Sequence, residues 1–180
     1  MSVTINASTT SGLVMTSDLS GTLSLQSNGV AVTVPAVAGT MMVSGNMPAF
    51  SYYQSSATSV SANTFTKISF QTSNFDTTTG MYASSRFTPT VAGYYQINGG
   101  VGVATAANRI ITTIYKNGSV YQYGNDNGAA STANTGTVSG LVYCNGSTDY
   151  IEIYVFFGTA QNTAASSVQT YFSGCLVRSA

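Results

Sequence analysis

Few residues in this 180-residue chain could carry out acid–base or nucleophilic chemistry. Histidine is absent, which removes the base of Ser–His and Cys–His nucleophilic systems and the commonest metal ligand. Asp149 and Glu152 are the closest pair of acids, but residues three apart on a strand point to opposite sides of a sheet. We therefore expect Asp149 to lie in a turn and Glu152 to be a solvent-facing strand residue. The sequence predicts a protein that is not an enzyme and has no cofactor.

Two other uses of the acids stay open. A distant carboxylate, Asp76 or Asp126, could approach the pair in the folded chain, or could bind calcium together with backbone carbonyls. The chain has only five acids, however, so we predict no metal site.

Cys144 and Cys175 are the only cysteines. They are too few and too far apart for a disulfide framework or a four-ligand zinc site. We expect both to be small buried apolar groups, with a single disulfide as the alternative.

Tyrosines and asparagines are the remaining candidates for a binding surface. Tyrosine has a flat apolar face and a polar tip, which suits contacts with sugars or receptors. We expect most tyrosines to lie in the core or at an interface between subunits. The segment 124–136 is rich in Gly, Asn, Ser and Thr, a composition that suits adaptable recognition next to tyrosines. The predicted exposed recognition residues are Tyr121, Tyr123, Asn125 and Asn127.

Composition favours an all-β protein whose surface meets other protein. Charged residues make up 6% of the chain, against roughly a quarter in ordinary soluble domains. The five basic residues are scattered, so nucleic acid and membrane surfaces are not expected partners. The start of the chain lacks the pattern of a secretory leader, and no apolar run approaches the ~20 residues of a membrane span. We expect a chain made inside the cell that assembles with other proteins.

The strands can be placed from residues 85–97, SRFTPTVAGYYQI. Pro89 and Gly93 predict a turn over 88–92, because proline fixes φ and glycine tolerates positive φ. The alternation that follows predicts a strand with one buried side, formed by Tyr95, Ile97, Gly99, Val101 and Val103.

Further strands are predicted around 65–70, 109–115, 120–123, 138–144, 149–157 and 170–177. Asn117-Gly118 is the strongest hairpin signal in the chain. Residues 74–80 are predicted to form a loop, and 124–136 a loop or a distorted edge strand.

Residues 1–47 differ from the rest in being poor in aromatics, and we treat them as an arm before a domain at 48–180. The pattern from Leu23 to Val34 around Ser-Asn-Gly predicts a hairpin. Two strands alone are not stable in water, so the arm must lie on its own domain, on sister chains or on a larger particle. The predicted attachment residues are Val3, Ile5, Leu13, Leu23, Leu25, Val30 and Val32.

Six segments of the domain, taken in order, resemble the C1q/TNF-like trimeric jelly roll. They are PAFS (48–51), FDTTTG (75–80), RFTPTVAGYY (86–95), IYKNG (114–118), VSGLVYCNGSTDYIEIYV (138–155) and TYFSG (170–174). The resemblance implies an all-β, ten-stranded jelly-roll β-sandwich and a homotrimer in which one sheet edge of each subunit packs around the threefold axis.

The arm, INASTTSGLVMTSDLSGTLSLQSNGVAVTV (5–34), resembles the start of many bacteriophage fibre and virion proteins. This resemblance implies a virion structural protein, made in the host cytoplasm, whose arm attaches to the phage particle and whose head projects from it. We predict a capsid decoration or cement protein on the major capsid protein, because no heptad or fibrous repeat separates arm and head. A short tail or neck fibre whose head binds a host surface receptor is the alternative. A free carbohydrate-binding module or an enzyme accessory domain is a third class.

Overall fold

The computed structural model describes residues 23–27, 30–34, 47–78, 80–128 and 134–180. Within these ranges every regular element is a β-strand. Over the same ranges there is no helix that could span a membrane. The chain divides into two units, Met1–Met41 and Met42–Ala180, and the second is called the head below. The domain boundary expected at 47/48 stays a prediction.

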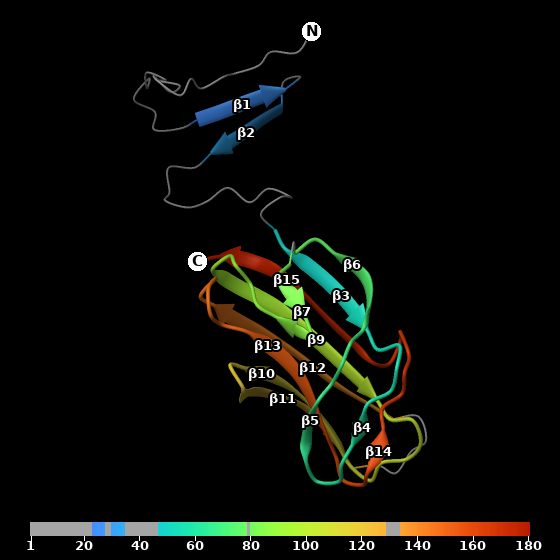
Figure 1. Ribbon diagram of the computed structural model, residues 1–180. Coiled ribbons are helices and arrows are strands. Elements are labelled where there is room, and N and C mark those ends of the chain that lie inside the picture. Colours follow the sequence, from blue (N-terminus) through green and yellow to red (C-terminus); the bar gives the residue numbers. More distant parts are fainter. Residues whose placement is uncertain (1–22, 28–29, 35–46, 79, 129–133) are drawn as a thin grey trace. The chain divides into compact units, whose positions relative to one another are not determined.

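The described residues of the first unit form a hairpin of β1 (Leu23–Ser27) and β2 (Val30–Val34) (Figure 1). The strands pair antiparallel, with Leu23 opposite Val34 and Leu25 opposite Val32. The hairpin expected from the sequence is confirmed. Of the predicted attachment residues, Val3, Ile5 and Leu13 lie outside the described residues.

The head is a sandwich of two antiparallel sheets, shown in Figure 1. One sheet has five strands, in the order β12 (Thr135–Cys144), β9 (Gly93–Gly102), β15 (Tyr171–Ser179), β3 (Ala49–Tyr53) and β6 (Thr72–Asp76). It is called the five-stranded sheet.

The second sheet has six strands, in the order β11 (Ser119–Asn127), β10 (Ile110–Lys116), β13 (Ile151–Phe157), β8 (Arg86–Phe87) and β7 (Tyr82–Ala83), with β5 (Phe65–Lys67) also paired to β13. β4 (Ser59–Val60) and β14 (Gln161–Asn162) form a separate two-stranded antiparallel sheet. The all-β jelly-roll sandwich expected from the sequence is confirmed.

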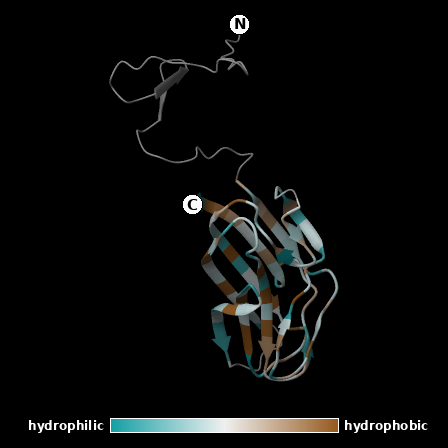
Figure 2. Ribbon diagram, turned by 60° about the vertical axis from the view of Figure 1, so that its left-hand side comes forward, coloured by the Kyte–Doolittle hydropathy of each residue, from teal (hydrophilic) through white to brown (hydrophobic). Residues whose placement is uncertain are grey.

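The core lies between the two sheets, and residues alternate between buried and less buried positions along β12 and the first parts of β9 and β15. Bands of opposite hydropathy along the strands of Figure 2 show this alternation. On β9 the predicted buried side, Tyr95 to Val103 at every second position, is confirmed, and Tyr94 is exposed. Phe50 is central to the core, since the centroid of its ring lies 4.6 Å from the ring centroid of Phe87 and 4.9 Å from that of Phe172.

The predicted turns are present where the sequence places them. Residues 88–92 form the turn before β9. Asn117 (φ 53°) and Gly118 (φ 78°) join β10 to β11, and Lys116 pairs with Ser119 across them. Positive φ at both central residues defines the hairpin turn that best matches strand twist.

Two segments differ from the sequence prediction. Residues 72–76 form an edge strand, although 74–80 were expected to be a loop; Asp76 pairs with Phe50 and Thr72 with Tyr53. Pairing with β3 overrides the turn preference of Asn74 and Asp76. The strand expected over 65–70 ends at Lys67.

Candidate functional site

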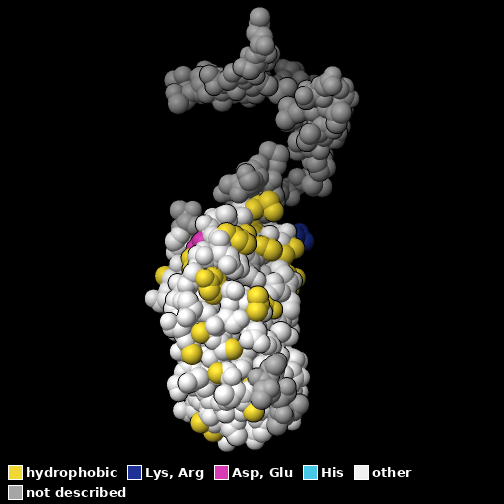
Figure 3. Space-filling model, turned by 90° about the vertical axis from the view of Figure 1, so that its right-hand side faces the viewer, with side chains coloured by type: hydrophobic (Ala, Val, Ile, Leu, Met, Phe, Trp, Pro, Cys, Tyr) yellow, Lys and Arg dark blue, Asp and Glu magenta, His cyan; other side chains and the backbone are white. Residues whose placement is uncertain are grey.

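Charge is distributed unequally between the two sheets of the head. Seven of the charged side chains that the structure describes lie on the six-stranded sheet or on residues next to its strands: Lys67, Arg86, Arg109, Lys116, Asp126, Asp149 and Glu152. Asp76 and Arg178 lie on the five-stranded sheet. In the view of Figure 3, charged side chains are visible only near one end of the head.

Glu152 is buried, so the expectation of a solvent-facing strand residue is wrong. Its side chain is 2% exposed and accepts hydrogen bonds from Lys67 Nζ at 2.7 Å and Arg86 Nε at 2.9 Å. These two cations, supplied by β5 and β8, cover the carboxylate. Burial acts to raise the pKa of Glu152, but the hydrogen bonds from Lys67 and Arg86 together lower it below its ordinary value.

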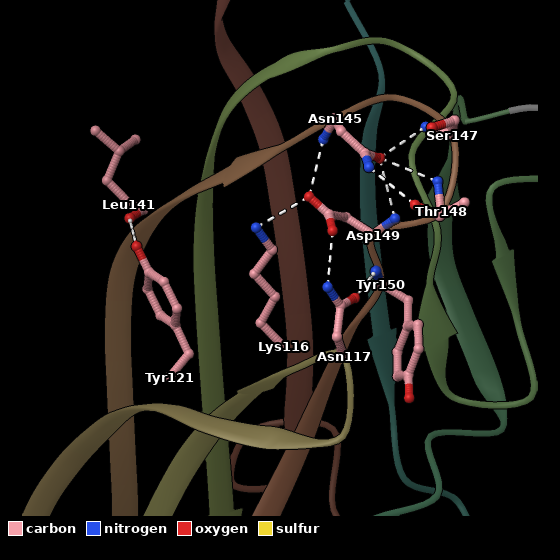
Figure 4. Close-up of polar contacts among 9 residues, drawn as sticks. All are labelled: Lys116, Asn117, Tyr121, Leu141, Asn145, Ser147, Thr148, Asp149 and Tyr150. Carbon is pink, nitrogen blue, oxygen red and sulfur yellow. Dashed lines mark hydrogen bonds and ion pairs between the residues drawn. The ribbon is translucent and has the colours of Figure 1, made fainter.

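Asp149 lies in the turn before β13, as expected, and joins two turns of the head (Figure 4). It accepts hydrogen bonds from Asn117 Nδ2 at 2.7 Å and Asn145 N at 3.0 Å, and pairs with Lys116 Nζ at 2.9 Å. The Asn145 side chain in turn accepts three backbone N–H bonds, from Ser147, Thr148 and Asp149. The hydrogen bond from Asn117, followed by that from Lys116, lowers the pKa of Asp149.

The acids serve structure at these positions and do not form a catalytic pair. Asp126 bonds to Arg109, and Asp76 accepts a hydrogen bond from the Tyr52 hydroxyl at 2.7 Å. Each of the four acids that the structure describes therefore has partners of its own, and a carboxylate with a lowered pKa stays anionic at neutral pH and is no general acid. Over the described part of the chain, no three His, Cys, Asp or Glu side chains gather in a group that could hold a metal ion.

The two cysteines are both free thiols, and they differ in exposure. Cys144 is buried, as expected, and burial raises the pKa of its thiol to about 12. Cys175 is exposed, so the expectation of burial is wrong for it. It lies on the outer side of β15, where it pairs with Gln96 and Ala49, because its neighbours Gly174 and Leu176 occupy the buried side.

The outer side of the five-stranded sheet forms a surface that we call the uncharged face. Register places its residues in rows across the strands: Thr137, Gly100, Tyr171 and Tyr53; Ser139, Asn98, Ser173, Ser51 and Phe75; Leu141, Gln96, Cys175 and Ala49; Tyr143 and Tyr94. Arg178 lies at the end of the last row. The face thus consists of hydroxyls, amides, tyrosines and small groups.

The middle of the uncharged face is ordered by side-chain hydrogen bonds. Ser139 Oγ donates to Asn98 Oδ1 at 2.8 Å and accepts from Gln96 Nε2 at 2.9 Å. Beside this network, Leu141 is 50% exposed, and the Tyr94 and Tyr143 rings are exposed with their centroids 5.4 Å apart. Exposed tyrosine and leucine in a surface poor in charge are typical of the centre of a protein–protein interface.

The predicted recognition residues lie together on β11. Tyr121 and Tyr123 are exposed, as is Asn125, and Asn127 is partly buried. The Tyr121 hydroxyl donates to the Leu141 carbonyl at 3.1 Å, and Asn125 Oδ1 accepts from Thr137 N at 2.6 Å, so both also tie β11 to β12. Their role in recognition stays a prediction.

β11 contains a β-bulge at the start of the segment 124–136, which was expected to be a loop or a distorted edge strand; which residues the bulge involves was not predicted. Ile111 pairs with Asp126 and Thr113 with Tyr123, so Gly124 and Asn125 together stand opposite Thr112. The extra residue places Tyr123 and Asp126 on the same side of the sheet, although residues three apart otherwise face opposite sides. The signal in the sequence is Gly124, since a Cβ there would lie 2.0 Å from the Thr137 carbonyl oxygen.

No protein-family model matches the chain, and no curated protein is similar to it in sequence. Solved structures do resemble it. Eiger TNF from S. frugiperda matches with a TM-score of 0.61 at 8% identity, over 74% of this chain and 94% of that one. The globular domain of zebrafish complement 1qA protein gives 0.57 at 15% identity, over 74% and 99%. Murine APRIL gives 0.53 at 11% identity, over 73% and 100%. The head therefore has the C1q/TNF-like jelly-roll fold that the sequence motifs implied.

Proposed function

We propose that this chain, whose head has the jelly-roll fold of C1q and TNF domains, is a non-enzymatic structural protein of a bacteriophage virion. In this proposal it is a homotrimeric capsid decoration or cement protein. Its N-terminal arm binds the major capsid protein, and the three heads project from the particle as one unit. The resemblance of residues 5–34 to phage virion proteins supports the phage origin.

The proposal of a trimer rests on the uncharged face. Burying a charged side chain costs several kcal/mol unless it is paired, so a surface meant for burial should carry few charges. The rows from Thr137 to Leu141 hold no charged residue across four strands, whereas the opposite sheet carries most of the charge. Exposed Leu141, Tyr94 and Tyr143 supply the apolar contact area.

The arm contributes through avidity. Three arms joined by one trimeric head bind as a set, because each bound arm holds the next one at high local concentration. Weak contacts by each arm, including the predicted attachment residues Leu23, Leu25, Val30 and Val32 of the hairpin, then add up to firm binding. The hairpin is too small to be stable alone, which favours a docked role for it.

A short tail or neck fibre is the alternative function. The exposed residues Tyr121, Tyr123 and Asn125 of β11 favour it, because they would form a receptor-binding surface along the edge strand of the six-stranded sheet, next to β12.

Copy number and position in purified virions separate the two roles. A quantitative gel combined with labelled-antibody electron microscopy should give hundreds of copies over the capsid for a decoration protein. A handful of copies at the tail or neck would reject decoration and favour the fibre.

Deletion of residues 1–45 tests the arm. The truncated protein should still form trimers through its head but should be lost from virions, and capsids without it should break at lower temperature. Full incorporation of the truncated protein would show that the arm does not anchor it.

A further inference from the structure

The outer side of the six-stranded sheet carries a hollow of about 350 Å³, lined by aromatic rings and one ion pair. Register explains its composition. Phe65, Phe156, Ile111 and Asp126 form one row across β5, β13, β10 and β11. Tyr123 belongs to the neighbouring row, opposite Thr113. The uncharged face lies on the other sheet.

The bulge at Gly124 and Asn125 is what creates the hollow. Without it, Tyr123 and Asp126 would point to opposite sides of β11. With it, the Tyr123 ring lies 5.8 Å from the Phe65 ring, and Asp126 meets Arg109 on the same side. Aromatic surface and hydrogen-bonding groups are thereby placed next to each other.

The aromatic part offers an exposed, fixed surface. Tyr123 is 57% exposed. Phe65 and Phe156 are partly buried, and their ring centroids are 5.4 Å apart. The Tyr123 ring packs beside that of Phe65. Side chains of this kind keep few rotamers, so binding on them costs little conformational entropy.

The polar part is a charge-neutral pair. Arg109 donates through Nε to Asp126 Oδ1 at 2.8 Å and through Nη2 to Oδ2 at 2.6 Å. The hydrogen bond from Arg109 lowers the pKa of Asp126, so the carboxylate is anionic at neutral pH. About half of each side chain remains exposed. Arg109 therefore keeps unused N–H donors, and Asp126 keeps unused lone pairs.

We propose that this hollow binds a neutral pyranose sugar. A pyranose ring has an apolar C–H face that can lie on Tyr123 and hydroxyl groups that both donate and accept at its edge, which suits the adjacent Arg109 and Asp126. The Arg109–Asp126 pair has no net charge, so it gives a charged ligand no net electrostatic attraction and favours a neutral one. The volume suits a single ring. This site requires neither the trimer nor the arm.

Saturation-transfer NMR on the full-length protein tests the site. The probes are the methyl pyranosides of glucose, galactose, mannose and N-acetylglucosamine, with N-acetylneuraminic acid and glucosamine as charged comparisons. At least one neutral pyranoside should receive saturation at its C–H protons with a dissociation constant in the millimolar range, and should bind better than both charged sugars. Absence of transfer to every neutral pyranoside, or stronger binding of a charged sugar, overturns the proposal.

Variants assign the signal to the hollow. Tyr123→Ala should weaken binding about ten-fold, because it removes the stacking surface. Val168→Ala is the control, since it trims an exposed apolar side chain outside the hollow, and it should bind as the parent does. Asp126→Asn, which keeps the side-chain shape, should also weaken binding and serves if Tyr123→Ala does not fold. Equal binding by the parent and the folded hollow variants refutes the assignment.

Discussion

At the residue scale, Glu152 links three strands, because its carboxylate on β13 holds Lys67 of β5 and Arg86 of β8. The guanidinium of Arg86 also lies 3.9 Å from the centroid of the Tyr150 ring. The arrangement keeps a buried carboxylate charged in a chain that has few ionic groups.

Glu152→Gln should lower the free energy of unfolding by about 2 kcal/mol. The substitution keeps the shape but leaves two cations without their anion, and the exposure of Lys67 (31%) and Arg86 (44%) limits the loss. Urea denaturation followed by tyrosine fluorescence measures it. Asp126→Asn is the control: it removes an exposed ion pair and should leave the midpoint nearly unchanged. An equal effect of both substitutions would show that burial of Glu152 does not matter.

Acid should destabilise the head, since Glu152 and Asp149 both have lowered pKa values. A carboxylate whose pKa is lower in the folded state contributes stability above its unfolded pKa, about 4, and loses it as pH falls toward the folded value. The melting temperature should therefore be flat above about pH 5 and fall below it. Glu152→Gln should have a lower plateau and a shallower fall. A slope for the variant as steep as that of the parent would contradict the assignment.

The sequence predicted the conformation of a residue correctly where that conformation depends on neighbouring residues alone. Asn117-Gly118 and the alternation of β9 were predicted correctly, because a turn residue and a two-residue period act on their neighbours alone. The burial of Glu152 was predicted wrongly, because it depends on distant strands. Lys67 is 85 residues away in sequence from Glu152, and no local sequence pattern predicts that ion pair. Cys175 was expected to be buried as a small apolar group, but its neighbours Gly174 and Leu176 occupy the buried side of β15.

At the element scale, β11 determines how the outer surface is organised. Its first irregularity lies at Tyr121, between the Tyr115–Val120 and Ile114–Gln122 pairs, and its second lies at Gly124 and Asn125. The sequence predicted a loop or a distorted edge over 124–136, which anticipates the irregularity. It did not predict that the strand continues to Asn127 or which side chains the bulge brings together, since both depend on pairing with β10.

Gly124→Ala should destabilise the head by about 2 kcal/mol or more. The added methyl group would meet the backbone carbonyl oxygens of Thr137 at 2.0 Å and Thr112 at 2.7 Å, neither of which can move without breaking the sheet. Gly128→Ala is the matched control at the end of the same segment, because a Cβ there meets nothing within 4 Å. Thermal unfolding by circular dichroism compares them. Equal melting temperatures of the two variants would show that the backbone at the bulge accommodates the added methyl group without loss of stability.

At the scale of the whole molecule, the head separates two kinds of surface. The five-stranded sheet presents the uncharged face, and the six-stranded sheet presents ion pairs and aromatic rings. If the uncharged face is the interface of a trimer, the ionic and aromatic surface is left open to solvent. Assembly and recognition then place no conflicting demands on the same residues.

Leu141→Asp should dissociate the proposed trimer into monomers at micromolar concentration, because it places an unpaired carboxylate in the middle of the uncharged face. Sedimentation velocity measures the change. Val168→Asp is the control, since Val168 is an 82% exposed apolar residue outside this face, and its variant should stay trimeric. A parent protein that sediments as a monomer, or a trimeric Leu141→Asp variant, argues against this interface.

The contrast between the two thiols makes the chain suitable for single-site labelling. Cys144 is enclosed and stays protonated because its pKa is raised to about 12, whereas Cys175 is exposed on the uncharged face. A maleimide dye added to the native protein should therefore attach at one known position without any engineering. If subunits meet at this face, the alkylation rate should fall as the protein concentration rises, and the half-time of that protection would report the lifetime of the assembly.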